Sequence, residues 1–416
     1  MWSVSAGTII DSGTTATVVA PGSPGTMVVS ASADGISGSA NVVVTAVPPT
    51  PPALPTLTWL QTVSLGTGGN LVGVATDGVS LLAVGYRMNS ANDGNVGVAF
   101  AFHDAGQSAD FLGSVDMGTT NSLFESAAVA SSAVIGGSVG ANAIAVTLNP
   151  QTGQTNSVVQ CPIGTFTAMA RDSARIYYVS GSSLLVGDLA GAIDCNQTPI
   201  TITGTRLGSI RRIAVGVNNH LLAVGDYVDF STAQFRSGFV TDIDIATGNT
   251  VWNRADDELA GVQGLSVAVT MENETTVVYV SGTQWPSLRA NDMFVTKLAE
   301  MDGQTISPWP VKVDTGSSLP VNFAADVVLN TSAFGGIVLA GQAPKLDAPS
   351  PVSTEAFFAG LAPDGKVLWT FRDNLAVGNS DGIQAAAGAG SAIYVTGTFG
   401  QFTSASIGLV AKFTLE

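Results

Sequence analysis

Residues able to carry acid–base or metal chemistry are scarce in this sequence. It has 416 residues, of which 11% are charged and two are histidines, His103 and His220. Each histidine lies at the edge of a predicted strand with no metal-ligand partner nearby in the sequence, so we expect structural or solvated roles. We predict no metal site and no cofactor, but leave calcium binding open because several carboxylates could supply oxygen ligands, although no Asp-x-Asp-x-Asp-Gly loop is present. These carboxylates are Asp226, Asp229, Asp292 and the run Asp256-Asp257-Glu258.

Side chains suited to recognition are more numerous. Aromatic rings combined with guanidinium groups in polar segments are typical of surfaces that bind proteins or carbohydrates. In this sequence they lie in or beside segments that we interpret as long loops between strands. The alternative is that the rings fold back onto the edges of their own sheets. The candidate binding residues are Tyr86, Arg87, Tyr227, Phe230, Arg236, Trp285, Arg289 and Phe399.

The strands that would hold these loops form a repeat. Seven times an apolar run ends in glycine, with a period near ~50 residues. Gly is abundant (48) and Ser, Thr, Ala and Val are frequent, a composition that favours strands and tight turns. A period of this length made only of strands indicates a β-propeller with seven blades. The repeated glycines are Gly85, Gly137, Gly181, Gly225, Gly282, Gly341 and Gly397.

The two ends of the repeat region complement each other. The last repeat stops after its third strand, whereas Thr58–Gly66 resembles a fourth strand and precedes the first repeat. Pairing this segment with Gly408–Leu415 would close the ring and leave no open sheet edge. We therefore predict an all-β chain with a seven-bladed propeller over residues 57–416, closed by an N-terminal outer strand.

One face of such a propeller carries the loops from second to third strands and from fourth to first strands. The second-to-third loops are longest in repeats one, four, five, six and seven, so we predict that this face binds the partner. The predicted innermost strands are mostly Ala, Val and Gly, and their ionisable exceptions are Glu125, Arg171 and Asp326. An enzyme that used the central funnel would need such groups to be clustered. Two or more convergent ionisable groups at the funnel mouth would favour that alternative.

The segment before the repeats has a different character. Residues 1–46 contain short strand-like runs separated by Gly and Pro turns, and residues 47–56 are a Pro-rich linker that favours an extended spacer. Trp2-Ser3-Val4-Ser5, the turn at Pro21–Gly25 and the Val-rich strand that ends at Val44 resemble the second half of a bacterial Ig-like domain. That resemblance implies a truncated Ig-like β-sandwich in a chain that continues upstream.

Two late repeats carry a further resemblance. Ile393–Gly397 followed by Gly408–Phe413, and Val278–Gly282 followed by Asp292–Leu298, are similar to bacterial secreted or surface β-propeller repeats of the type Tyr-Val-Thr-Gly … Phe-Val-Ala-Lys-Leu. The resemblance implies an extracellular or cell-surface location, with the periplasm as an alternative, and it transfers no catalytic residue. Asp242–Trp252 resembles the repeat of pyrroloquinoline-quinone propellers, and we interpret its Trp252 as blade packing rather than a cofactor site.

The net charge limits the classes of partner that this protein is expected to bind. The net charge of −16 disfavours nucleic acid, and no apolar stretch of about 18 residues predicts a membrane span. The basic cluster Arg206, Arg211 and Arg212 could bind an anionic ligand, but ion pairing with the surplus carboxylates is favoured.

The spacing of Cys161 and Cys195 fits no zinc site. A secreted location favours their pairing, but our strand assignment places them on opposite faces, so the disulfide stays open.

These observations predict a non-enzymatic extracellular or cell-surface binding or adhesion module, monomeric within a longer chain. Its long-loop face would hold a protein or carbohydrate. An enzyme that uses the central funnel, such as a glycan lyase, a hydrolase or a quinone-dependent oxidoreductase, is the alternative. The sequence does not identify the ligand.

Overall fold

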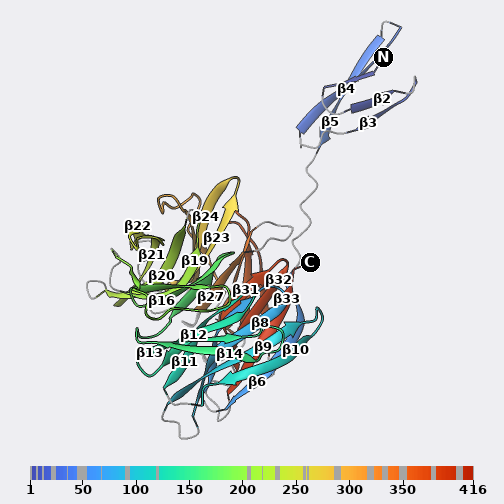
Figure 1. Cartoon of the computed structure of the whole chain (residues 1–416). Coiled ribbons are helices and arrows are strands. Elements are labelled where there is room, and N and C mark those ends of the chain that lie inside the picture. Colours follow the sequence, from blue (N-terminus) through green and yellow to red (C-terminus); the bar gives the residue numbers. More distant parts are fainter. Residues whose placement is uncertain are drawn as a thin grey trace. The chain divides into compact units, whose positions relative to one another are not determined.

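The computed structural model divides the chain into two compact units, Met1–Pro52 and Ala53–Glu416. Every regular element in its described part is a β-strand (Figure 1). Among the residues described, no helix has the length and apolar character that crossing a membrane requires. The described residues are 2–5, 8–11, 14–19, 25–34, 36–44, 54–66, 68–89, 94–118, 121–203, 208–217, 219–229, 235–255, 259, 262–284, 292–315, 323–329, 336–345, 354–375, 381–399 and 406–415.

The first unit contains two small sheets. β1 (Trp2–Val4), β4 (Gly25–Ala33) and β5 (Ile36–Val44) form one sheet in the order β1-β4-β5, and β2 (Thr8–Asp11) pairs with β3 (Ala16–Val19). Met27 is buried, whereas Ile10 and Ile36 are exposed. These sheets do not by themselves identify an Ig-like domain, so that assignment stays a prediction.

The described part of the second unit contains seven four-stranded antiparallel sheets, which we call blades 1 to 7. Within a blade the strands pair in chain order, with the innermost strand first. The strands of blades 1 to 4 are β7 (Asn70–Thr76), β8 (Ser80–Met88), β9 (Asn95–Asp104) and β10 (Ala109–Asp116); β11 (Ser122–Val129), β12 (Ala133–Val139), β13 (Asn142–Leu148) and β14 (Thr155–Cys161); β15 (Ala168–Arg171), β16 (Arg175–Ser180), β17 (Ser183–Asp188) and β18 (Ile200–Thr201); and β19 (Ser209–Val215), β20 (His220–Asp229), β21 (Phe235–Asp244) and β22 (Thr250–Arg254).

Blades 5 to 7 follow the same order, except that blade 7 takes its outer strand from the front of the unit. Their strands are β23 (Val262–Glu272), β24 (Thr275–Gln284), β25 (Asp292–Ala299) and β26 (Val311–Val313); β27 (Phe323–Leu329), β28 (Ile337–Pro344), β29 (Thr354–Leu361) and β30 (Val367–Asp373); and β31 (Asp381–Ala389), β32 (Ala392–Phe399), β33 (Ser406–Thr414) and β6 (Thr56–Gly66).

The pairing of β6 with β33 confirms the predicted closure. The two strands run antiparallel, with Trp59 opposite Lys412 and Gly66 opposite Ser406. Because the two ends of the unit share one sheet, the first and last blades leave no unpaired edge between them. The predicted partner segments, 58–66 and 408–415, agree with the observed strands to within two residues.

A buried polar cluster holds this closure together. The carboxylate of Asp104, at the end of β9 in blade 1, accepts hydrogen bonds from the Tyr394 hydroxyl (2.5 Å), the Lys412 ammonium (2.7 Å) and the Trp59 indole N–H (3.2 Å). These three donors come from β32, β33 and β6 of blade 7. Blade 5 repeats the pattern, since Tyr279 and Lys297 both donate to Glu272. The Tyr and Lys of the two late repeats are therefore structural residues that clamp a carboxylate.

The core lies between the blades. Among the described residues, seven clusters of buried apolar side chains each join two neighbouring blades. The second and third strands are covered on both faces, and β12 and β13 are buried along nearly their whole length. A strand covered on both faces carries apolar residues at consecutive positions rather than alternating ones. This burial explains the apolar runs of the repeat.

In most blades a β-bulge explains the glycine that ends the apolar run. In six blades, all except blade 3, the first and second strands shift register at a β-bulge near the start of the innermost strand. In blade 2 the bulge lies opposite Gly137, where a Cβ would be 1.9 Å from the Leu123 carbonyl oxygen. The same close approach occurs at Gly85 (2.0 Å), Gly225 (2.0 Å) and Gly397 (1.7 Å). Only glycine permits this approach of two backbones.

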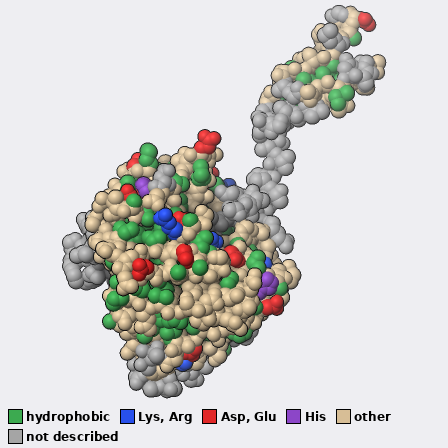
Figure 2. Space-filling model, viewed as in Figure 1, with side chains coloured by type: hydrophobic (Ala, Val, Ile, Leu, Met, Phe, Trp, Pro, Cys, Tyr) green, Lys and Arg blue, Asp and Glu red, His purple; other side chains and the backbone are tan. Residues whose placement is uncertain are grey.

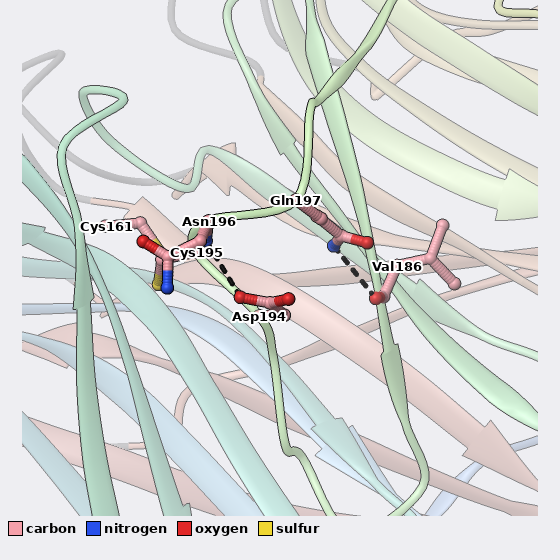
Figure 3. The surroundings of a disulfide bond; sticks show 6 residues. All are labelled: Cys161, Val186, Asp194, Cys195, Asn196 and Gln197. Atoms are coloured by element: carbon pink, nitrogen blue, oxygen red, sulfur yellow. Dashed lines mark hydrogen bonds between the residues drawn. A yellow bond between two sulfur atoms is a disulfide. The ribbon is translucent and has the colours of Figure 1, made fainter.

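Cys161 and Cys195 form a disulfide, with their Cα atoms 5.1 Å apart (Figure 3). We expected Cys195 on the face opposite Cys161, and this expectation was wrong. The outer strand of blade 3 is reduced to β18, which pairs with the start of β17. The connection from the end of β17 therefore runs back along the blade edge, where the Gln197 side chain donates to the Val186 carbonyl (3.2 Å). This path brings Cys195 beside the end of β14.

Trp252 joins two blades, as predicted from its repeat. It lies on β22 of blade 4, and its indole N–H donates to the Glu300 carbonyl of blade 5 (2.6 Å). A Cβ at Gly303 would lie 2.6 Å from the same ring. The side chain therefore packs against the turn that follows β25, in agreement with a blade-packing role.

Candidate functional site

The innermost strands surround a central channel. A cavity of about 160 Å³ lies within it and is lined by residues of all seven innermost strands. Most of this lining is Ala, Gly, Val, Ile or Met, as the sequence predicted. The polar exceptions are Glu125, Ser126, Arg212, Ser266 and Asp326.

A second cavity of about 270 Å³ adjoins the first, since Glu125 and Arg212 line both. It lies at the end of the channel where the innermost strands begin, which is the face that carries the second-to-third and fourth-to-first loops. We call this end the channel mouth. It is lined by Val72, Tyr86, Leu123, Glu125, Thr167, Arg211, Arg212 and Gln384.

Four of the side chains that line the mouth belong to β-bulge residues. In blades 1, 2, 4 and 7 the residue within each bulge is Val72, Glu125, Arg211 or Gln384, and all four line the mouth. The residue that follows each of them lines the channel below. A bulge turns two consecutive residues toward the same side, whereas a regular strand would direct them to opposite sides. In these four blades the repeated glycine thus affects the candidate site, because it permits the bulge.

Arg212 bridges several blades across the channel. From β19 of blade 4 its guanidinium donates to the Val72 carbonyl of blade 1 (3.3 Å) and to the Arg211 carbonyl (3.1 Å). Its Nε lies 3.6 Å from Oδ1 of Asp326 in blade 6. The Arg212 side chain is 32% exposed and that of Asp326 is 9% exposed.

Asp326 has partners for both carboxylate oxygens. Besides Arg212, the amide N–H of Ala386 in blade 7 donates to Oδ2 (2.7 Å) and the Ser266 hydroxyl of blade 5 donates to the carboxylate. Burial raises the pKa of Asp326, while Arg212, Ser266 and Ala386 act in the opposite direction. Asp326 therefore links the innermost strands of four blades, which is a structural role.

Glu125 lies in a different environment. It is half-buried between the two cavities, and in the described part of the chain its carboxyl group has no hydrogen-bond partner. Burial raises its pKa, and the nearby charges of Arg211 and Arg212 oppose that rise. Beneath it the Ser126 hydroxyl is buried and also has no partner in the described structure.

Two of the three members of the basic cluster lie in ion pairs, as predicted. Arg211 Nε lies 3.1 Å from Oδ1 of Asp226, and Arg212 lies beside Asp326. Arg206, the third member of the cluster, lies outside the described residues. In the described part of the mouth and channel, four charged groups therefore come together: Glu125, Arg211, Arg212 and Asp326. The sequence marked Glu125 and Asp326 as exceptions on the innermost strands but did not place the two arginines beside them.

The predicted binding residues lie in different environments in the structure. Tyr86 lines the mouth. Arg87 instead forms a salt bridge with Asp116 (2.7 Å) at the edge of blade 1. Tyr227 is buried in the cluster between blades 3 and 4, and Phe399 packs against the cluster between blades 6 and 7. The positions of these last two agree with the alternative, in which the rings fold back onto the blade.

Four predicted residues receive no structural test. Phe230, Trp285 and Arg289 lie outside the described residues, and Arg236 is described only as part of β21.

Arg171, an ionisable exception on the innermost strands, lies at the end of β15, away from the mouth, and is exposed. Of the calcium candidates, Asp226 pairs with Arg211, and the run 256–258 is not described. In the described part of the chain no three His, Cys, Asp or Glu side chains are grouped to hold a metal ion.

Comparisons with known proteins show which fold this protein has, and they show no family. No family model matches the sequence, and no curated protein is detectably similar to it. A chain of the mitotic checkpoint complex is similar in structure, with a TM-score of 0.55 and 9% identity over 89% of this chain and 95% of that chain. The Pan2 WD40 domain of Neurospora crassa is also similar, with a TM-score of 0.52 and 9% identity over 83% and 89%. The second unit is therefore a WD40-like β-propeller. The bacterial repeat family stays a prediction.

Proposed function

We propose that this protein is a non-enzymatic binding module that holds a protein partner at the channel mouth. One observation carries the proposal: four β-bulges direct side chains from different blades into one open cavity at the end of the channel where the innermost strands begin. A rigid ring that presents a concave, mixed polar and apolar surface is suited to recognition. WD40-like propellers commonly serve as protein-binding scaffolds, and one of the similar structures is part of a multiprotein complex.

The same geometry weighs against catalysis in the funnel. Convergent ionisable groups are present, which by itself favours the enzyme alternative. However, Arg212 and Asp326 are engaged with one another and with backbone groups, and Arg211 is engaged with Asp226. In the described mouth this leaves Glu125 as the carboxyl group without a partner, whereas glycoside hydrolysis requires two carboxyl groups on either side of the bond.

A protein is favoured over a carbohydrate on the side chains described. Sugar rings are usually held by several exposed aromatic faces. In the part of the mouth that the structure describes, Tyr86 is the aromatic residue that lines the cavity, and two other predicted rings are packed into the blades. Carbohydrate remains the alternative ligand class.

We further propose an extracellular or cell-surface location, where an Ig-like segment and the Pro-rich linker present the propeller for adhesion. The Cys161–Cys195 disulfide supports this proposal, because such bonds persist mainly in oxidising compartments. The periplasm would satisfy the same requirement.

The test is a selection with the full chain from a randomised peptide-display library, run beside a glycan array. Both use the wild type and the double variant Tyr86→Ala/Gln384→Ala, which removes two mouth side chains. We expect peptides that bind the wild type and not the variant. Glycans that bind in a mouth-dependent way would replace the protein by a carbohydrate partner. Ligands that bind both forms equally would place the binding surface elsewhere and overturn the proposal.

A further inference from the structure

We propose that the channel mouth receives a cationic side chain, a lysine or arginine of the partner, on the carboxylate of Glu125. This inference rests on the proposed function and specifies the chemistry of the partner. It is carried by the arrangement of charged groups around Glu125, taken together with the shape of the mouth.

Among the described residues of the mouth and the adjoining channel, the charged groups are unequal in number. Three carboxyl groups, Glu125, Asp226 and Asp326, meet two guanidinium groups, Arg211 and Arg212. Each guanidinium has a nearer partner than Glu125, and the donors of Arg212 are further occupied by two backbone carbonyls. Glu125 is therefore the group that a ligand can still satisfy.

An incoming anion would meet the opposite situation. It would meet guanidinium groups that already have a carboxylate neighbour, and it would face the carboxylate of Glu125 at the same mouth. An incoming cation displaces nothing and supplies the missing partner. The net charge of −16 also attracts cationic partners over a long range.

The remaining lining fits the stem of such a side chain. Val72, Leu123 and Tyr86 offer apolar surface at the mouth. The methylene groups of lysine and arginine bury against such surface while their charged ends reach a polar group, and a cation near the Tyr86 ring gains a favourable interaction with its face.

Binding should also be coupled to protonation. Burial raises the pKa of Glu125, opposed by Arg211 and Arg212, and a bound cation would lower that pKa. Among the described residues, the other titratable groups that face this region are Tyr86, Asp226 and Asp326. Because only ionised Glu125 pairs with a cation, affinity should increase as the pH rises through the titration of Glu125, and binding should release protons.

The experiment uses the full chain and four blocked pentapeptides that differ only in a central Arg, Lys, Gln or Glu. Titration calorimetry is run in two buffers of different ionisation enthalpy, so that proton release is measured directly. We expect the Arg and Lys peptides to bind at least about tenfold more tightly than the Gln and Glu peptides, as a charge-assisted hydrogen bond implies.

Variants then assign the effect to one residue. Glu125→Gln should weaken the Arg peptide by about tenfold or more and abolish proton release, whereas Glu125→Asp should retain part of both. Glu274→Gln is the matched control, since Glu274 is exposed in the β23–β24 turn at the opposite face and should bind as the wild type. Thermal unfolding of each variant shows whether it is folded, and the peptide series on the wild type tests the inference independently of any variant.

The possible failures separate the two proposals. Equal binding of all four peptides, a preference for the Glu peptide, or unchanged binding by a folded Glu125→Gln variant would overturn the cationic inference. If the display selection also yields mouth-dependent peptides without Lys or Arg, the proposed function stands and only this inference falls. If it yields no mouth-dependent ligand of any kind, the proposed function falls with it.

Discussion

At the scale of single residues, the repeated glycine connects the fold to the site. Gly137 faces the bulge that holds Glu125, and the backbone there is too close for any side chain. Five further blades carry a bulge at the same phase of the repeat. In these six blades one small residue therefore shapes the wall of the channel and sets the direction of side chains at its mouth.

Gly137→Ala tests this link. The added Cβ would overlap the Leu123 carbonyl oxygen, so the bulge must shift, and we expect the free energy of unfolding to fall by about 2–3 kcal/mol in urea titrations. Gly38→Ala makes the same chemical change where a Cβ meets no atom within 4 Å, and it should leave the propeller transition unchanged. Equal stability of the Gly137 variant and the wild type would contradict the role given to this glycine.

At the scale of elements, blade 3 differs from the other blades. Its outer strand β18 has two residues, its innermost strand β15 has four, and its first strand pair has no bulge. The disulfide ties the connection before β18 to the end of β14 in blade 2. This covalent bond replaces part of the backbone pairing that a longer outer strand would supply.

Removing the disulfide should therefore destabilise the propeller. The bond closes a sequence separation of 34 residues, and we expect Cys161→Ala/Cys195→Ala to lower the free energy of unfolding by about 3–4 kcal/mol. A reducing agent should have a similar effect on the wild type and no effect on the variant, as followed by urea unfolding. An unchanged transition for the reduced wild type would show that the bond contributes nothing to stability.

At the scale of the whole molecule, ring closure is the critical contact. β6 and β33 come from the two ends of the unit, and the side chain of Asp104 joins blade 1 to three strands of blade 7. Burial alone would raise the pKa of Asp104, but hydrogen bonds from Lys412, Tyr394, Gly106 and Trp59 together outweigh it and hold the pKa below the usual value of 3.8.

Asp104→Asn should therefore destabilise the ring in a pH-dependent way. We expect a loss of about 2 kcal/mol near neutral pH, because the amide replaces a carboxylate that accepts charge-assisted bonds. A lowered folded-state pKa stabilises the protein above the unfolded value, and this stabilisation is lost as the pH falls through the folded-state pKa. The difference between variant and wild type, measured by thermal unfolding from pH 7 to pH 3, should thus shrink on acidification.

Asp110→Asn is the matched control, since Asp110 is exposed on the neighbouring strand β10 and takes no part in the closing contacts described above. It should change stability by less than about 0.5 kcal/mol. A constant difference between Asp104→Asn and the wild type across this pH range would contradict the assignment of the closing contact to the ionised carboxylate.

The distribution of charged side chains on the surface also belongs to this scale. On the face drawn in Figure 2, charged side chains are sparse and scattered among uncharged ones. This pattern agrees with the low charged fraction of 11%. We therefore expect electrostatic recognition on this face to depend on single charged groups rather than on a large charged patch.

The sequence alone determined the architecture. Apolar runs at a regular interval can be buried on both faces only if sheets stack side by side, and the spare strand around Trp59 had one incomplete sheet to join. The blade-packing role of Trp252 followed from the same repeat. These features depend on local patterns and on a period, both of which are visible along the chain.

The tertiary structure alone decided the site. Val72, Glu125, Arg212 and Asp326 belong to four different blades, and a register shift of one residue at each bulge sets whether a side chain faces the channel or a neighbouring blade. The pairing of Cys161 with Cys195 likewise depended on the path of a connection after a shortened strand. Such outcomes result from contacts between distant segments, and no spacing within a single segment encodes them.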